Sequence, residues 1–181
     1  MTEWFEGDAS RNDLESAFVR RLREEASSWQ LPDLSPTDTS VVAARTLVPL
    51  VIEVDVPGLP QVANLCRTLR IGFWSTTRRA PAIEGEWGDA YFFDNYNGND
   101  PQCLTVRGID SNGDDLASMS AHWLLKQLRR NVEREDWLSH GELFASRWRL
   151  ADTGHVLGKQ GSWLRRRIAG KPDRVIPVRP S

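Results

Sequence analysis

The sequence of 181 residues has few cysteines and no long hydrophobic run, and each shortage excludes a class of protein. Its two cysteines stand far apart, which excludes a disulfide scaffold and a cysteine-based zinc cluster. The most apolar stretch, residues 46–56, is interrupted by Pro49, Glu53 and Asp55 and is far shorter than the ~20 residues that span a bilayer. The residues after Met1 are acidic, unlike a signal peptide, so we expect a cytoplasmic protein.

No sign of charge dominates the chain. It carries 23 basic and 25 acidic residues, a formal net charge of -2, so no overall field favours nucleic acid or a membrane. Hydrophobic residues make up 40% and charged residues 27% of the chain, as in an ordinary folded domain. Tryptophan is abundant instead: eight Trp are spread along the sequence, and a residue this large is rarely buried completely.

Apolar periodicity predicts helices and strands. Residues 12–29 and 114–130 carry apolar side chains at helical spacing. Alternation and composition predict strands over residues 50–56, 69–76, 86–94, 104–109 and 142–150. These patterns predict a core that includes Leu14, Phe18, Leu22, Ile52, Val54, Val106, Leu116, Trp123, Leu124 and Leu128.

The order of these elements predicts an α+β fold. We expect two main amphipathic helices packed on a mainly antiparallel sheet, with a short basic C-terminal helix at residues 162–168. A single domain is expected to span residues 1–181, with flexible tails at 1–9 and 169–181 and a proline-rich loop at 31–40.

Local motifs for ligand binding are incomplete. Asp110–Asp114 offers oxygen atoms at calcium-loop spacing, but Asp115 replaces the required glycine and Ala121 the required glutamate. A glycine-containing turn followed by an aspartate that caps the second helix is the better interpretation. Residues 153–160 resemble a phosphate-binding loop but lack the Ser or Thr after Lys159.

No catalytic motif is present in the sequence. The three histidines lie neither at i, i+4 spacing nor beside a cysteine, and no Gly-x-Ser-x-Gly elbow occurs. We therefore expect no metal, no cofactor and no catalytic residue, and a site assembled from distant residues stays open only as a residual alternative.

One segment of the chain carries a large excess of acidic residues. Between Pro81 and Asp115 lie eight acidic residues and one base, Arg107, together with several aromatic residues. Carboxylates steer a basic partner and aromatic rings supply buried contacts, so this acidic-aromatic stretch predicts a docking surface. We expect the function of an inhibitor or immunity-type protein that binds a basic protein, such as a toxin. The predicted partner-binding residues are Glu86, Trp87, Asp89, Tyr91, Asp94, Tyr96 and Asp100.

A nucleic-acid-binding accessory function is the alternative. Between Lys159 and Ser181 there are seven bases and one acid, so the end of the chain is basic. Arginine next to tryptophan can contact phosphates and stack on bases. The rest of the chain is acidic and would repel a duplex, which ranks this alternative second. Its predicted residues are Trp163, Arg165, Arg166, Arg167 and Arg174.

Overall fold

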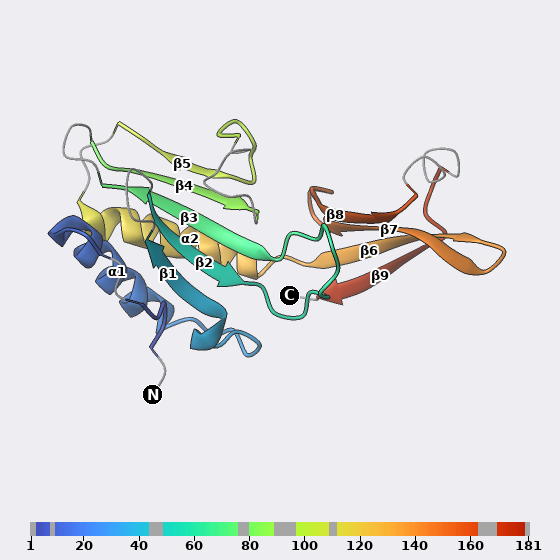
Figure 1. Ribbon diagram of the computed structural model, residues 1–181, viewed down its shortest axis with the longest axis horizontal. Helices are drawn as coiled ribbons and strands as arrows, with labels where there is room; N and C mark the ends of the chain where they lie inside the picture. Colours follow the sequence, from blue (N-terminus) through green and yellow to red (C-terminus); the bar gives the residue numbers. More distant parts are fainter. Residues whose placement is uncertain are drawn as a thin grey trace. The chain divides into compact units, whose positions relative to one another are not determined.

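The structure, a computed structural model, describes residues 3–7, 10–43, 49–75, 80–88, 97–108, 112–162 and 170–179 (Figure 1). The chain forms two compact units. Unit 1 comprises Met1–Pro57 and Thr68–Leu128, and unit 2 comprises Gly58–Arg67 and Arg129–Ser181.

Unit 1 contains an antiparallel sheet whose strand order follows the sequence, β1-β2-β3-β4-β5. A short 3-10 helix at Pro36–Asp38 precedes it, within the segment expected to be a proline-rich loop. The strands are β1 (Thr39–Ala43), β2 (Leu50–Asp55), β3 (Thr68–Trp74), β4 (Ala82–Trp87) and β5 (Leu104–Val106).

Two helices, α1 (Asp13–Ala26) and α2 (Gly113–Leu128), cover one face of this sheet (Figure 1). Asn12 caps α1, because its Oδ1 accepts a hydrogen bond from the Glu15 backbone N–H at 2.9 Å. Asn112, rather than an aspartate, caps α2 by accepting from the backbone N–H of Asp115 at 2.8 Å.

The core of unit 1 lies between the helices and the sheet. Phe18 of α1 stacks on Phe73 of β3 with ring centroids 4.3 Å apart. Of the ten predicted core residues, eight are buried, whereas Leu14 and Val106 are half-buried. The helical periodicity therefore identified the correct faces of both helices.

Unit 2 contains a second antiparallel sheet in the order β8-β7-β6-β9. A two-residue turn joins β6 to β7, and its residues His140 and Gly141 have φ of 52° and 85°, as a type I′ turn requires. Trp137, Trp148 and Leu150 are buried in this unit. Its strands are β6 (Val132–Ser139), β7 (Glu142–Leu150), β8 (Val156–Gly161) and β9 (Arg174–Arg179).

The predicted fold class is wrong. The described residues form two antiparallel sheets rather than one, and they contain more strand than helix. In place of a short basic C-terminal helix, the described chain ends in β9, while residues 163–169 lie outside the described residues. β6 was missed because Glu133–Asp136 are four consecutive charged residues, which hide the alternation of a strand. The strand predicted at 86–94 begins earlier than expected: β4 spans Ala82–Trp87, and residues 89–94 lie outside the described residues.

Candidate functional site

The face of the unit 1 sheet opposite the helices carries a group of charged side chains. The antiparallel register places Glu53 of β2 opposite Arg70 of β3, and Arg70 opposite Glu86 of β4. Glu84 lies two residues before Glu86 and therefore projects from the same face. We call Glu53, Arg70, Glu84 and Glu86 the Glu86 cluster.

The carboxylates of this cluster are not equally paired. Arg70 Nη2 lies 2.6 Å from Glu53 Oε1, and Arg107 forms an ion pair with Glu84. Glu86 is only 6% exposed, and its Oε1 has no hydrogen-bond partner among the described residues. Glu86 is therefore a buried carboxylate with an unsatisfied oxygen, an arrangement that costs free energy when the group is ionised.

Burial raises the pKa of the Glu86 carboxyl above its ordinary value. The positive charge of Arg70 acts in the opposite direction, and the negative charge of Glu84 raises the pKa further. A cation brought close to Glu86 from outside would favour the ionised form, since opposite charges stabilise each other more strongly where water is excluded.

Cys103 lies close enough to this cluster for the charge of Glu86 to affect the pKa of its thiol. Burial, together with the charges of Asp100 and Glu86, raises the pKa of the Cys103 thiol to about 11. The thiol is therefore protonated near neutral pH, and the attacking species in cysteine chemistry is the thiolate. This environment does not favour a cysteine nucleophile.

The other predicted partner-binding residues do not share one face. Trp87 projects toward the helices, where its indole Nε1–H donates to Gln127 Oε1 at 3.0 Å, so it lies on the face opposite Glu86. Asp100 is half-buried and accepts a hydrogen bond from the Gln102 backbone N–H at 2.8 Å. The remaining predictions, Asp89, Tyr91, Asp94 and Tyr96, lie outside the described residues.

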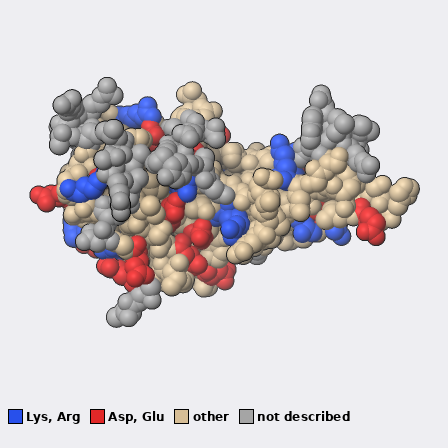
Figure 2. All heavy atoms as spheres, viewed as in Figure 1, with Lys and Arg blue, Asp and Glu red and all other residues tan. Residues whose placement is uncertain are grey.

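Of the residues predicted to bind nucleic acid, Arg174 forms an ion pair within unit 2. Arg174 Nε donates to Asp136 Oδ2 at 2.8 Å, and Asp136 is completely buried in unit 2. Trp163, Arg165, Arg166 and Arg167 lie outside the described residues. On the side of unit 1 shown in Figure 2, Lys and Arg are interspersed with Asp and Glu, which is not the basic face expected of a phosphate-binding surface.

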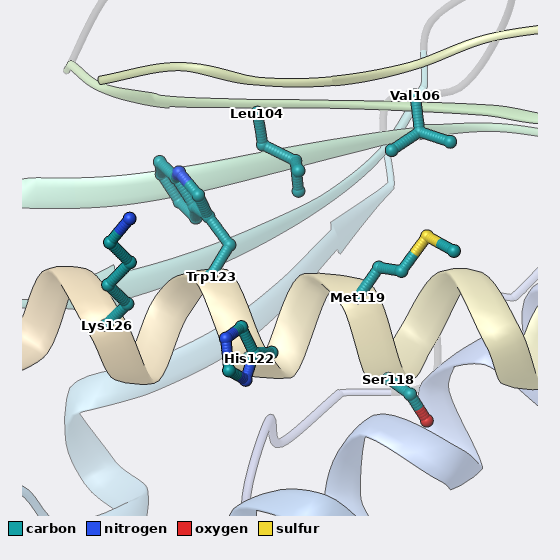
Figure 3. Close-up of a pocket in the computed structure, with 7 residues that line it drawn as sticks. All are labelled: Leu104, Val106, Ser118, Met119, His122, Trp123 and Lys126. Atoms are coloured by element: carbon teal, nitrogen blue, oxygen red, sulfur yellow. The ribbon is translucent and has the colours of Figure 1, made fainter. Parts of the chain in front are cut away.

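An apolar groove of about 520 Å³ lies between β5 and α2 in unit 1 (Figure 3). The groove was not predicted, because the helical spacing of the apolar residues in α2 indicates a stripe that faces the core, with Met119 as one of its members. Met119 belongs to that stripe but is 41% exposed. The groove is lined by Leu104, Val106, Ser118, Met119, His122, Trp123 and Lys126.

Within the described ranges, no group of three His, Cys, Asp or Glu side chains could hold a metal ion. Neither α1 nor α2, the helices of the described chain, is long and apolar enough to cross a membrane. No protein-family model, curated protein or solved structure matches the chain.

Proposed function

We propose that this protein is a non-catalytic binding protein that docks a basic protein partner through the Glu86 cluster and the acidic-aromatic segment that follows β4. The observation that carries the proposal is the unsatisfied carboxylate of Glu86, which lies beside a second buried carboxylate, Glu84. A partner's ammonium or guanidinium group would supply the cation that this pair of carboxylates lacks.

Three carboxylates and Arg70 form the cluster, so it has more negative than positive charge. Arg107, which pairs with Glu84, has a side chain that is 62% exposed, so the outer end of this ion pair is in contact with water. An excess of negative charge attracts a basic protein before contact and raises its association rate.

The acidic segment extends this charge along the sequence. Asp89, Asp94 and Asp100 follow β4, and Tyr91 and Tyr96 supply aromatic rings among them. Trp87 contacts Gln127 instead, so the contact area of the proposed interface comes from the two tyrosines. An inhibitor or immunity-type role, in which the basic partner is a toxin, is the finer form of this proposal.

The test is quantitative capture of partners from the native cell by the parent protein and by matched variants. We expect one basic protein to be captured by the parent and by the control Asp33→Asn, which neutralises an exposed acid outside the segment. Capture should fall with Glu86→Gln and with the double variant Asp94→Asn, Asp100→Asn. Tyr96→Ala should speed dissociation and cost about 2 kcal/mol of binding free energy. A partner captured equally by every variant would overturn the proposal.

A further inference from the structure

We propose that the groove between β5 and α2 binds an amphipathic carboxylate, a small molecule with an apolar chain and one carboxylate head group. The groove lies on the helix-covered face of the unit 1 sheet, away from the Glu86 cluster, so this inference is independent of the proposed protein docking.

The walls of the groove are apolar and come from two elements. Leu104 and Val106 of β5 point toward Met119 and Trp123 of α2 across the groove (Figure 3). Both β5 residues are half-buried and Met119 is exposed, so apolar surface here remains in contact with water. A volume of about 520 Å³ lies within the usual range of small-molecule sites, and an apolar chain in the groove would remove this surface from water.

The position of Trp123 in the groove is fixed by close packing. A Cβ at Gly85 would lie 3.2 Å from the Trp123 ring and 2.7 Å from the Ile71 side chain, so only glycine lets the indole pack this closely on the sheet. The Trp123 indole Nε1–H also donates to the Gln102 carbonyl oxygen at 3.2 Å. The apolar wall is therefore preorganised, which lowers the entropy cost of binding.

The charge at one end of the groove identifies the head group. Within the described part of unit 1, six arginines each form an ion pair with a carboxylate, and Lys126 is the one Lys or Arg that does not. Its side chain rises beside Trp123 at the end of the groove (Figure 3). His122, one turn earlier on α2, is exposed and lines the groove as well. A single ammonium matches the single charge of a carboxylate.

The chain contains two methionines, Met1 and Met119, which makes a site-specific readout available. Protein labelled with ¹³C at the methionine methyl groups gives one signal from the groove and one control signal from Met1. The probe is decanoate below its micelle concentration, and its neutral amide of the same chain length is the control ligand. We expect decanoate to shift the Met119 signal saturably, to leave the Met1 signal in place, and to bind more tightly than the amide.

Substitution of the lysine separates charge recognition from apolar contact. Lys126→Gln should weaken decanoate binding about tenfold or more while leaving amide binding unchanged, since it removes a charge-assisted contact. Lys159→Gln, at an exposed lysine of unit 2, should leave both affinities unchanged. No saturable shift of the Met119 signal, or equal decanoate affinity in Lys126→Gln and the parent, overturns the proposal. Tighter binding by an acetylated peptide with an apolar C-terminal residue also overturns it and assigns the groove to a protein ligand.

Discussion

Arg70 and Glu86 lie directly opposite one another on β3 and β4, yet the carboxylate held 2.6 Å from Arg70 Nη2 is that of Glu53. On the same strand and face, Glu84 is as buried as Glu86, with both residues 6% exposed, but Glu84 pairs with Arg107. The two glutamates thus form a matched pair that differs in ion pairing, and this difference can be measured.

Glu86→Gln should stabilise the protein at pH 7. The substitution removes a buried charge whose Oε1 has no described hydrogen-bond partner, and we expect a gain of about 1 kcal/mol in the free energy of unfolding. Because burial raises the pKa of Glu86 above 4.5, its charge opposes folding at pH 7. This cost, and with it the gain, should disappear as the pH falls below 4.5, where Glu86 is protonated in both folded and unfolded chains. Urea unfolding of the parent and of Glu86→Gln, at pH 7 and at a pH below 4.5, measures this difference in the free energy of unfolding.

Glu84→Gln is the control for that substitution. It also removes a buried charge, but it leaves Arg107 without this ion pair, so it should not stabilise the protein at pH 7. Equal stabilisation by both substitutions would show that ion pairing does not distinguish the two glutamates.

Truncation of buried side chains in the core of unit 1 should lower the free energy of unfolding, whereas truncation of an exposed side chain should not. Phe18 is fully buried and stacks on Phe73, so Phe18→Ala should lower the free energy of unfolding by about 3–5 kcal/mol. Leu124→Ala should cost about 2–5 kcal/mol. The control Met119→Ala, on the exposed part of α2, should change stability by about 0.5 kcal/mol or less. Chemical denaturation tests the three variants, and a parent-like midpoint for Phe18→Ala would contradict the assigned packing.

Substitution of Asp136 should lower the stability of unit 2 more than substitution of its exposed charged residues. Burial alone would raise the pKa of its carboxyl, but hydrogen bonds from Ser146, Arg174 and Arg134 outweigh burial and hold the pKa below 3.8. Asp136→Ala leaves these donors without their acceptor and should cost about 3–5 kcal/mol. The stabilisation by Asp136 is present above pH 3.8 and is lost as the pH falls through the lowered pKa. Acid unfolding of unit 2 should therefore begin at a pH below 3.8.

Asp152→Asn is the matched control, because Asp152 pairs with Arg130 but its side chain is 59% exposed. That variant should lose about 1 kcal/mol or less. Since we predict a single cooperative domain, Asp136→Ala should shift one common unfolding transition, followed by circular dichroism and by tryptophan fluorescence. A transition that splits into two would show that the units unfold independently.

Nucleic acid should bind weakly or not at all at physiological salt. The basic end of the chain attracts phosphates, but the acidic remainder opposes their approach, and salt screens the attraction. Fluorescence polarisation with labelled single-stranded DNA and RNA measures this affinity. Submicromolar binding at about 0.15 M salt that is lost when Arg165, Arg166 and Arg167 become Ala would reverse the ranking of the two functions.

The sequence predicts those elements whose side chains alternate between water and core. The stripes of α1 and α2 and the alternation of β2 are of this kind, and β7 begins and ends where predicted. Strand β6 of unit 2 is different, because Glu133 and Arg134 project from opposite faces of it and each has a charged partner there. A strand with charge on both faces carries no hydrophobic period, so β6, the central partner of β7 and β9, was not predicted.

The candidate sites could also be predicted only in part, because their main features depend on residues from different strands and helices. The acidic excess around Glu86 is visible in the sequence, but its missing hydrogen bond depends on which side chains β2, β3 and β5 place beside it. The apolar walls of the groove come from residues of β5 and α2 that resemble core positions in the sequence. The exposure of Met119, and the lack of an ion pair at Lys126 within the described residues, become informative only when β5 and α2 are known to lie side by side.

The most direct test of the proposed docking is the salt dependence of association between this protein and its captured partner. We expect the association rate constant of the parent to fall steeply between about 0.05 M and about 0.3 M salt. Glu86→Gln and the double variant Asp94→Asn, Asp100→Asn should associate more slowly and show a flatter salt dependence, while Asp33→Asn should match the parent. An association rate that is independent of salt, or that is the same in all four proteins, would contradict docking through this acidic surface.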